Sequence, residues 1–169
     1  SWPAFRNSHR RLACPSDGVD MVVSMDHGNK TDVHPTTKYP IGHRLALLAL
    51  SGQYGYNSLE AHSPELQHVE ALPQALRLTF AGTHELRTSD GAKLRGFEVV
   101  TYDGATHMLT GTLQGTTVTL QLPASLQTKT LWRLRYGWPP YTTANLTGAT
   151  GLPVSTFSID LKTPIYEAK

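Results

Sequence analysis

The sequence predicts two kinds of structure in succession, an α/β segment over residues 1–55 and an antiparallel β-sandwich over residues 56–169. A nearly continuous apolar run at residues 19–25 lies between two helical patterns, which is typical of a strand covered on both faces of a parallel sheet. From residue 56 onward, short runs with a period-two tendency alternate with turn signals, a pattern that indicates a sandwich of jelly-roll-like type.

Helices are expected on both sides of the apolar run. Residues 2–12 carry Pro3 in what would be a first helical turn, and their apolar residues lie roughly along one stripe. A second helix begins near Pro40, and its apolar residues recur at i, i+4 and i+7 until Gly52 or Gly55 ends it. The order helix, strand, loop, helix is an α/β pattern.

A single strand cannot form a sheet by itself, and about 55 residues of α/β structure are too few to bury it. Both edges of the strand at residues 19–25 would also leave hydrogen-bonding groups open. We therefore expect this strand to pair with strands of a companion N-terminal part, which is either a separate chain or a segment that precedes this sequence.

The expected strands of the second region are separated by turn signals such as Asp90-Gly91 and Asp103-Gly104. A Gly-, Pro- and Thr-rich connection follows at residues 136–157, and connections of this length are usually functional or packed against a neighbour. The expected strands are the runs QALRLTF, LRGFEVVT, HMLTGTL, TTVTLQL, LWRLRYGW and STFSIDL.

Composition excludes several classes of function. The net charge of +2 is scattered, without a basic stripe and interleaved aromatic residues, so we expect no nucleic-acid partner. No run approaches the roughly 20 apolar residues of a membrane span, so we expect no membrane partner either. Cys14 is the single cysteine, so an internal disulfide is impossible.

The loop at residues 26–38 follows the predicted strand, where ligand-binding and catalytic residues of open α/β sheets lie. Within it Asp32 stands two residues before His34, and Pro35 restricts His34 toward an extended backbone. An imidazole held at such a place can act as a general base, with a carboxylate fixing its tautomer. A metal site made of the Asp and His residues is a weaker interpretation, because no Cys pair or His-x-x-x-His helix accompanies them.

A resemblance to a known family is carried by the segment GVDMVVSMDHGNKTDVHPTTKYPIGHRLALLAL, which looks like the last catalytic block of the sialate O-acetylesterases, in the SGNH/GDSL hydrolase superfamily. That block has an apolar strand followed by Asp, then Asp-x-His-Pro, a Lys four residues beyond the His, and Gly-x-Arg-Leu-Ala. The helix WPAFRNSHRRLACP and the later LRGFEVVTYDG, LRYGWPPYTTANL and GLPVSTF are similar to other parts of the same family, in the same order. The residues that match the block are Asp26, Asp32, His34, Pro35, Lys38, Gly42, Arg44, Leu45 and Ala46.

The resemblance implies an acetyl ester hydrolase with a serine nucleophile and no metal or other cofactor. His34 matches the catalytic histidine and Asp32 the acidic residue beside it. The wider superfamily places the Asp three residues before the His, where Thr31 stands, so Asp26 or a backbone carbonyl is the alternative partner. The family's Gly-Gln-Ser-Asn-type block is absent from the sequence. The C-terminal piece of an SGNH-type catalytic domain, inactive alone, is therefore expected over residues 1–55, with the serine in the companion part.

The substrate that the resemblance implies is a 9-O-acetylated sialic acid, with acetylated xylan or another acetylated sugar as the alternative. His27 and Asn29 are candidate substrate contacts beside the expected base, and Trp138 could stack on a sugar ring. A different interpretation is a non-catalytic carbohydrate-binding domain over residues 56–169, which gives His34 no role. We expect a periplasmic, secreted or lysosomal protein.

Two further features have alternative interpretations. Arg44 is either a solvated charge on the second helix or the partner of a carboxylate at the domain boundary. The segment at residues 135–138 is either part of the sugar site or a brace between the β-region and the α/β segment.

Overall fold

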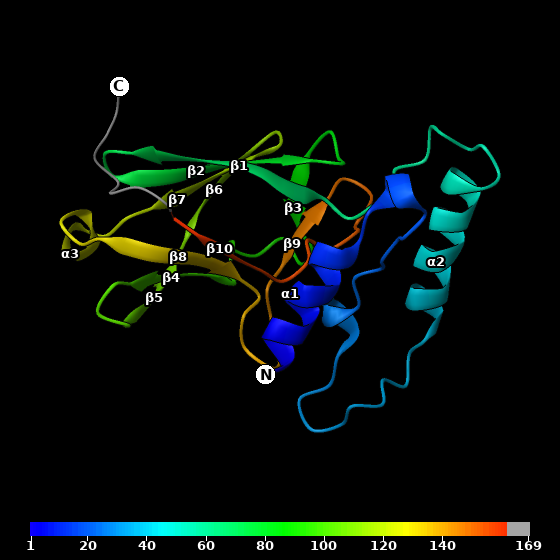
Figure 1. The fold of residues 1–169 in the computed structure, drawn as a ribbon, viewed down its shortest axis with the longest axis horizontal. Helices are drawn as coiled ribbons and strands as arrows, with labels where there is room; N and C mark the ends of the chain where they lie inside the picture. The colour runs from blue at the N-terminus through cyan, green and yellow to red at the C-terminus, as the bar shows by residue number, and fades with distance from the viewer. Residues whose placement is uncertain (162–169) are drawn as a thin grey trace.

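Two antiparallel sheets, packed face to face, form the body of the structure, which is a computed structural model that describes residues 1–161 (Figure 1). The first sheet has the order β1-β2-β7-β6, built from Glu65–Leu72, Ala75–Ala81, Thr117–Gln121 and Gly111–Gln114. The second has the order β10-β8-β4-β5, built from Phe157–Asp160, Leu131–Tyr136, Phe97–Thr101 and Thr106–Leu109. A small third sheet pairs β3 (Leu86–Thr88) with β9 (Leu146–Gly148).

The predicted antiparallel sandwich is confirmed, and all six predicted runs contain strands. The connections differ from those of a jelly roll, which is built from two Greek keys. Here β1–β2 and β6–β7 are hairpins of the first sheet, and β4–β5 is a hairpin of the second. The long connection at residues 136–157 is interrupted by β9, which pairs with β3.

The core lies between the two large sheets, where side chains from the facing surfaces of both sheets meet. In β7 Val118 and Leu120 are buried while their neighbours are not, and Leu76 and Leu78 of β2 lie in the same cluster. Each fully buried side chain of this size stabilises the fold by about 1.5–3 kcal/mol relative to exposure. The opposite sheet contributes the large aromatic and aliphatic residues Phe97, Val99, Leu134, Tyr136 and Phe157.

The predicted helices are confirmed as α1 (Trp2–Leu12) and α2 (Tyr39–Gly52), and a short α3 (Ala124–Gln127) precedes β8. Helix α1 packs beside β10, whereas Figure 1 shows α2 at the end of the molecule away from α3 and β5. Only Arg44 and Leu48 are buried in α2, although the helix is rich in apolar residues. None of the helices in residues 1–161 is long and apolar enough to cross a membrane.

Arg6 of α1 fastens the N-terminal segment to the sandwich. Its guanidinium donates hydrogen bonds to the hydroxyl of Thr156 at 2.8 Å and to three backbone carbonyls of the β8–β9 connection. Those carbonyls belong to Gly137, Pro139 and Pro140, at 2.8, 2.8 and 2.9 Å. Because several acceptors converge on one rigid, planar cation, α1 is fixed in orientation as well as in position.

The predicted strand at residues 19–25 is not formed in the described structure, so this part of the α/β prediction is wrong for the chain in isolation. Val19 makes a single isolated bridge to Cys14 and is 49% exposed, whereas Val23 is 5% exposed. Met25 begins a short 3-10 turn, Met25–His27. A strand exists only through hydrogen bonds to a neighbour, and the described residues place no strand beside this segment.

Replacing Tyr136 by phenylalanine is expected to lower the free energy of unfolding by about 1–3 kcal/mol. The Tyr136 hydroxyl accepts a hydrogen bond from the backbone N–H of Leu146 at 2.7 Å, and both residues are fully buried. Burial also raises the pKa of the Tyr136 phenol, so the group stays neutral. Without the hydroxyl the Leu146 N–H loses its partner. Denaturant unfolding measures the loss, and the matched change Tyr102→Phe, at a 71% exposed residue, should have almost no effect.

Candidate functional site

Residues 26–38, which we call the His34 loop, connect the 3-10 turn at Met25–His27 to the start of α2. Asn29 organises the first half of the loop, because its side-chain oxygen accepts hydrogen bonds from the N–H groups of Thr31 and Asp32 at 2.9 and 3.2 Å. The Thr31 hydroxyl lies 3.1 Å from the same oxygen. Asn29 therefore holds the loop in shape, and its predicted contact with substrate stays a prediction.

His34 is exposed, so its imidazole is accessible from solvent. The Asp32 carboxylate accepts a hydrogen bond from the backbone N–H of His34 at 2.8 Å. Asp32 thus shapes the backbone at His34, and in residues 1–161 no hydrogen bond or ion pair joins a carboxylate to the His34 ring. The prediction that Asp32 orients the imidazole during a reaction is not tested by this geometry.

Asp26, the alternative partner of His34, is bound to Arg44 instead. The two carboxylate oxygens accept hydrogen bonds from the two terminal nitrogens of Arg44 at 2.8 and 2.6 Å. Arg44 is only 7% exposed and also donates to the carbonyl oxygen of Val23 at 2.5 Å. Of the two interpretations of Arg44, pairing with a carboxylate is confirmed. We call this set the Arg44 clip: the Arg44 guanidinium, the Asp26 carboxylate and the Val23 carbonyl.

His27 lies beside the clip, since its Nε2 atom is 3.5 Å from Asp26 Oδ2 and 3.5 Å from Arg44 Nη2. The structure therefore places His27 at the start of the His34 loop, beside Asp26 and Arg44. Its predicted contact with substrate stays a prediction.

Trp138, the predicted sugar-stacking residue, is half-buried at the start of the β8–β9 connection. The guanidinium of Arg135 lies 4.7 Å from the centre of its ring and also pairs with Glu98 at 3.4 Å. Arg135 covers one face of the indole by a cation–π contact, so a sugar would have to stack on the opposite face.

The segment around Gly137 braces the two parts of the chain, as one of its two interpretations predicted. Arg6 donates to the Gly137 carbonyl, and the side chain of Met25 packs directly on the Gly137 backbone. The Met25 sulfur also lies 3.3 Å from the Thr156 hydroxyl. A Cβ at residue 137 would lie 3.2–3.3 Å from Met25 and Thr156, which is tight, and the backbone there has a φ of +59° that favours glycine, so a glycine here lets the start of the His34 loop approach the sandwich closely.

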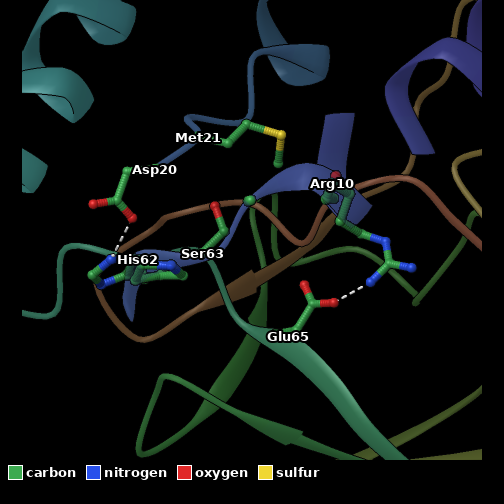
Figure 2. A pocket seen from close by; sticks show the side chains of 9 residues that line it. Arg10, Asp20, Met21, His62, Ser63 and Glu65 are labelled. Carbon is green, nitrogen blue, oxygen red and sulfur yellow. Dashed lines mark hydrogen bonds and ion pairs between the residues drawn. The ribbon is translucent and has the colours of Figure 1, made fainter. Parts of the chain in front are cut away.

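A cavity of about 260 Å³ lies where the N-terminal segment meets the sandwich (Figure 2). Two polar pairs lie at it: His62 Nε2 lies 2.9 Å from Asp20 Oδ1, and Arg10 forms an ion pair with Glu65. The lining residues are Arg10, Ala13, Pro15, Asp20, Met21, His62, Ser63, Glu65 and Ser155.

Sequence reasoning missed these pairs, because His62 and Asp20 are 42 residues apart and Arg10 and Glu65 are 55 apart. No local spacing signals such contacts. The cavity also contains Ser63 next to His62, but among the hydrogen bonds of the described residues none joins the Ser63 hydroxyl to the imidazole. The polar side chains of the cavity are paired with each other. The cavity is therefore better explained as a contact between the N-terminal segment and the sandwich than as a reaction site.

The weaker metal interpretation gains no support from the fold. In residues 1–161 no group of three or more His, Cys, Asp or Glu side chains is arranged to hold a metal ion. Asp26 and Asp32, two of the suggested ligands, are bound to Arg44 and to the His34 backbone, respectively.

Comparison with known proteins finds similarity among solved structures. No family model matches the chain, and no curated protein matches it. Among solved structures, the chain is similar to a carbohydrate acetylesterase from Xanthomonas citri, with 30% sequence identity and a TM-score of 0.76. The match covers 86% of this chain and 34% of that structure, so the chain spans about a third of the length of its structural relative. In fold and sequence, the chain is therefore similar to part of a carbohydrate acetylesterase.

Proposed function

We propose that this chain is the histidine-bearing part of a carbohydrate O-acetylesterase. The observation that carries the proposal is the similarity to the Xanthomonas citri carbohydrate acetylesterase, which extends over 86% of the chain at 30% identity. The exposed His34, in a loop whose ends and turns are held by hydrogen bonds, is consistent with a general base presented to a neighbouring group.

The proposed reaction is acyl transfer in two steps. A serine hydroxyl of the companion part attacks the acetyl carbonyl, while His34 Nε2 accepts the hydroxyl proton. His34 then returns this proton to the departing sugar oxygen as the tetrahedral intermediate collapses to an acetyl-enzyme. Water, deprotonated by His34, attacks the acetyl group, and acetate leaves as the serine regains its proton. Hydrogen-bond donors of the companion part stabilise the oxyanion, each by about 3 kcal/mol.

The surface of residues 1–56 supports the presence of a companion part. Most of the large exposed hydrophobic side chains of the described residues lie in this third of the chain. Val33 of the His34 loop is 70% exposed, Leu12 of α1 69% and Leu45 of α2 53%. Apolar side chains concentrated in this way indicate a surface that another protein segment covers. In this proposal residues 1–55 complete an SGNH-type domain, and the segment at residues 19–25 gains its strand partners there.

The proposed substrate is a 9-O-acetylated sialic acid, with acetylated xylan as the second choice. In this proposal His27 and Asn29 contact the sugar next to the base, and Trp138 presents the ring face that Arg135 leaves open. The proposed location is periplasmic, secreted or lysosomal.

The proposal is tested by measuring acetate release from the complete enzyme, made of this chain and the companion part. Acetate is expected from 9-O-acetyl sialic acid or from acetylated xylo-oligosaccharides, and none from this chain alone. Failure of the complete enzyme to release acetate from either substrate would contradict the proposal. Sugar binding by residues 56–169 without acetate release would favour the carbohydrate-binding alternative.

A further inference from the structure

We propose that Arg44 and Asp26 are positioning residues, which fix the His34 loop so that the imidazole meets the reacting serine. This inference rests on the proposed function, in which His34 is the general base. It assigns to the Arg44 clip a role in the rate of reaction in addition to its role in folding.

The first argument is where the clip lies along the chain. Asp26 is the first residue of the His34 loop, and Arg44 lies in the second turn of α2, the helix that follows the loop. The bidentate pair between them joins the start of the loop to the helix at its end. The Val23 carbonyl extends the same contact to the segment before the loop. Both ends of the loop are therefore fastened to one guanidinium.

The second argument is that the rest of the loop has only local support. Within the described part of the chain, every hydrogen bond of residues 28–37 stays inside the loop. Those bonds, made by Asn29 and Asp32, fix the turns but not their placement relative to the rest of the molecule. Helix α2 also starts without a side-chain cap at Lys38. The placement of His34 therefore depends on the two ends of the loop.

The third argument is the chemistry of the pair. Arg44 is 7% exposed, and its planar guanidinium directs N–H groups at two carboxylate oxygens and a carbonyl at the same time. A lysine carries the same charge but cannot reproduce this fixed, branched geometry. Arg44→Lys keeps the positive charge but should still disturb the loop. An effect of this variant would therefore come from the lost geometry and not from the lost charge.

The test measures kcat and KM of the complete enzyme with Arg44→Lys, Arg44→Ala and Asp26→Asn. A displacement of the base by about 1 Å lowers the rate of the chemical step by roughly 100-fold. We therefore expect kcat to fall about 10- to 100-fold while KM stays within about two-fold, because the change affects the transition state more than substrate binding. Arg77→Ala, at an exposed arginine of β2 in the sandwich, is the matched control and should leave both constants unchanged.

Chemical rescue distinguishes positioning from loss of fold. Added guanidinium, at concentrations well below those that unfold proteins, is expected to restore kcat of Arg44→Ala several-fold by occupying the space beside Asp26. It should not restore Asp26→Ala, in which the carboxylate is gone. The double change Asp26→Ala with Arg44→Ala should cost no more than the larger single change, because the two residues act as a unit.

The outcomes separate this inference from the proposed function. If His34→Ala abolishes turnover but Arg44→Lys and Asp26→Asn keep normal kcat, the positioning role is wrong and the general-base proposal stands. If His34→Ala leaves turnover intact, the proposed function itself fails. If Arg44→Ala unfolds, the test relies on kcat of Arg44→Lys and Asp26→Asn, and circular dichroism shows whether these two variants are folded. A loss of kcat that follows the unfolded fraction in all variants, without rescue, would overturn the inference.

Discussion

Replacing His34 by alanine is expected to lower kcat for acetate release by the complete enzyme by about 10²- to 10⁴-fold, the usual contribution of a general base. In the proposed reaction, loss of the imidazole leaves the serine with its proton and the departing sugar oxygen without a proton donor. Turnover of 4-nitrophenyl acetate and release of acetate from acetylated sugars both measure the effect.

The same substitution should leave stability nearly unchanged, which makes the experiment easy to interpret. His34 is exposed, and the hydrogen bond at this residue is made by its backbone N–H, which alanine also has. Changes at such surface residues usually alter the free energy of unfolding by less than about 0.5 kcal/mol. His68→Ala, at an exposed histidine of β1, is the matched control and should keep full activity. Undiminished turnover by His34→Ala would rule out the assignment of the base.

Replacing Phe97 by alanine is expected to lower the free energy of unfolding by about 3–5 kcal/mol. Phe97 on β4 is fully buried, and its ring centre lies 4.7 Å from that of Tyr136 and 6.2 Å from that of Phe157. These three rings belong to adjacent strands of the second sheet and point into the sandwich core. Removal of the Phe97 ring therefore loses both apolar burial and its contacts with the two neighbouring aromatic rings.

Guanidinium-induced unfolding of the chain measures this loss. Met108→Ala on the neighbouring strand β5 is the matched control, because Met108 is 63% exposed on the outer face of the same sheet. The control should change stability by no more than about 0.5 kcal/mol. A loss below about 1 kcal/mol for Phe97→Ala would show that the two sheets are not held together by this core.

The parts of the fold that depend on local pattern could be predicted from the sequence. Alternation in β7 and β8 and the helical stripe of α1 are local signals, and each corresponds to an observed element. Strand β1, with the sequence ELQHVEAL, was not predicted, because it lies at the edge of its sheet and lacks a clean alternation of buried and exposed residues. The short strands β3 and β9 were missed because each has only three residues, too few to show an alternating pattern.

The candidate site was predictable only in outline. The Asp-x-His pattern located Asp32 and His34 in one loop, but the spacing does not show that Asp32 binds the backbone of His34 instead of its ring. The pairing of Asp26 with Arg44 crosses 18 residues and was one of two interpretations of Arg44. The pairs that cross the cavity join residues more than 40 positions apart, and only the three-dimensional fold brings them together.

The anchorage of Arg6 has a consequence for how the molecule moves. Arg6 of α1 donates to four oxygen atoms of the other part of the chain, three in the β8–β9 connection and one at Thr156, so α1 cannot shift without breaking all four hydrogen bonds. Helix α1 and the sandwich therefore move together as one block. In the proposed function, a sugar stacked on Trp138 would lie on the same β8–β9 connection that Arg6 holds, so it would rest against a fixed part of the sandwich.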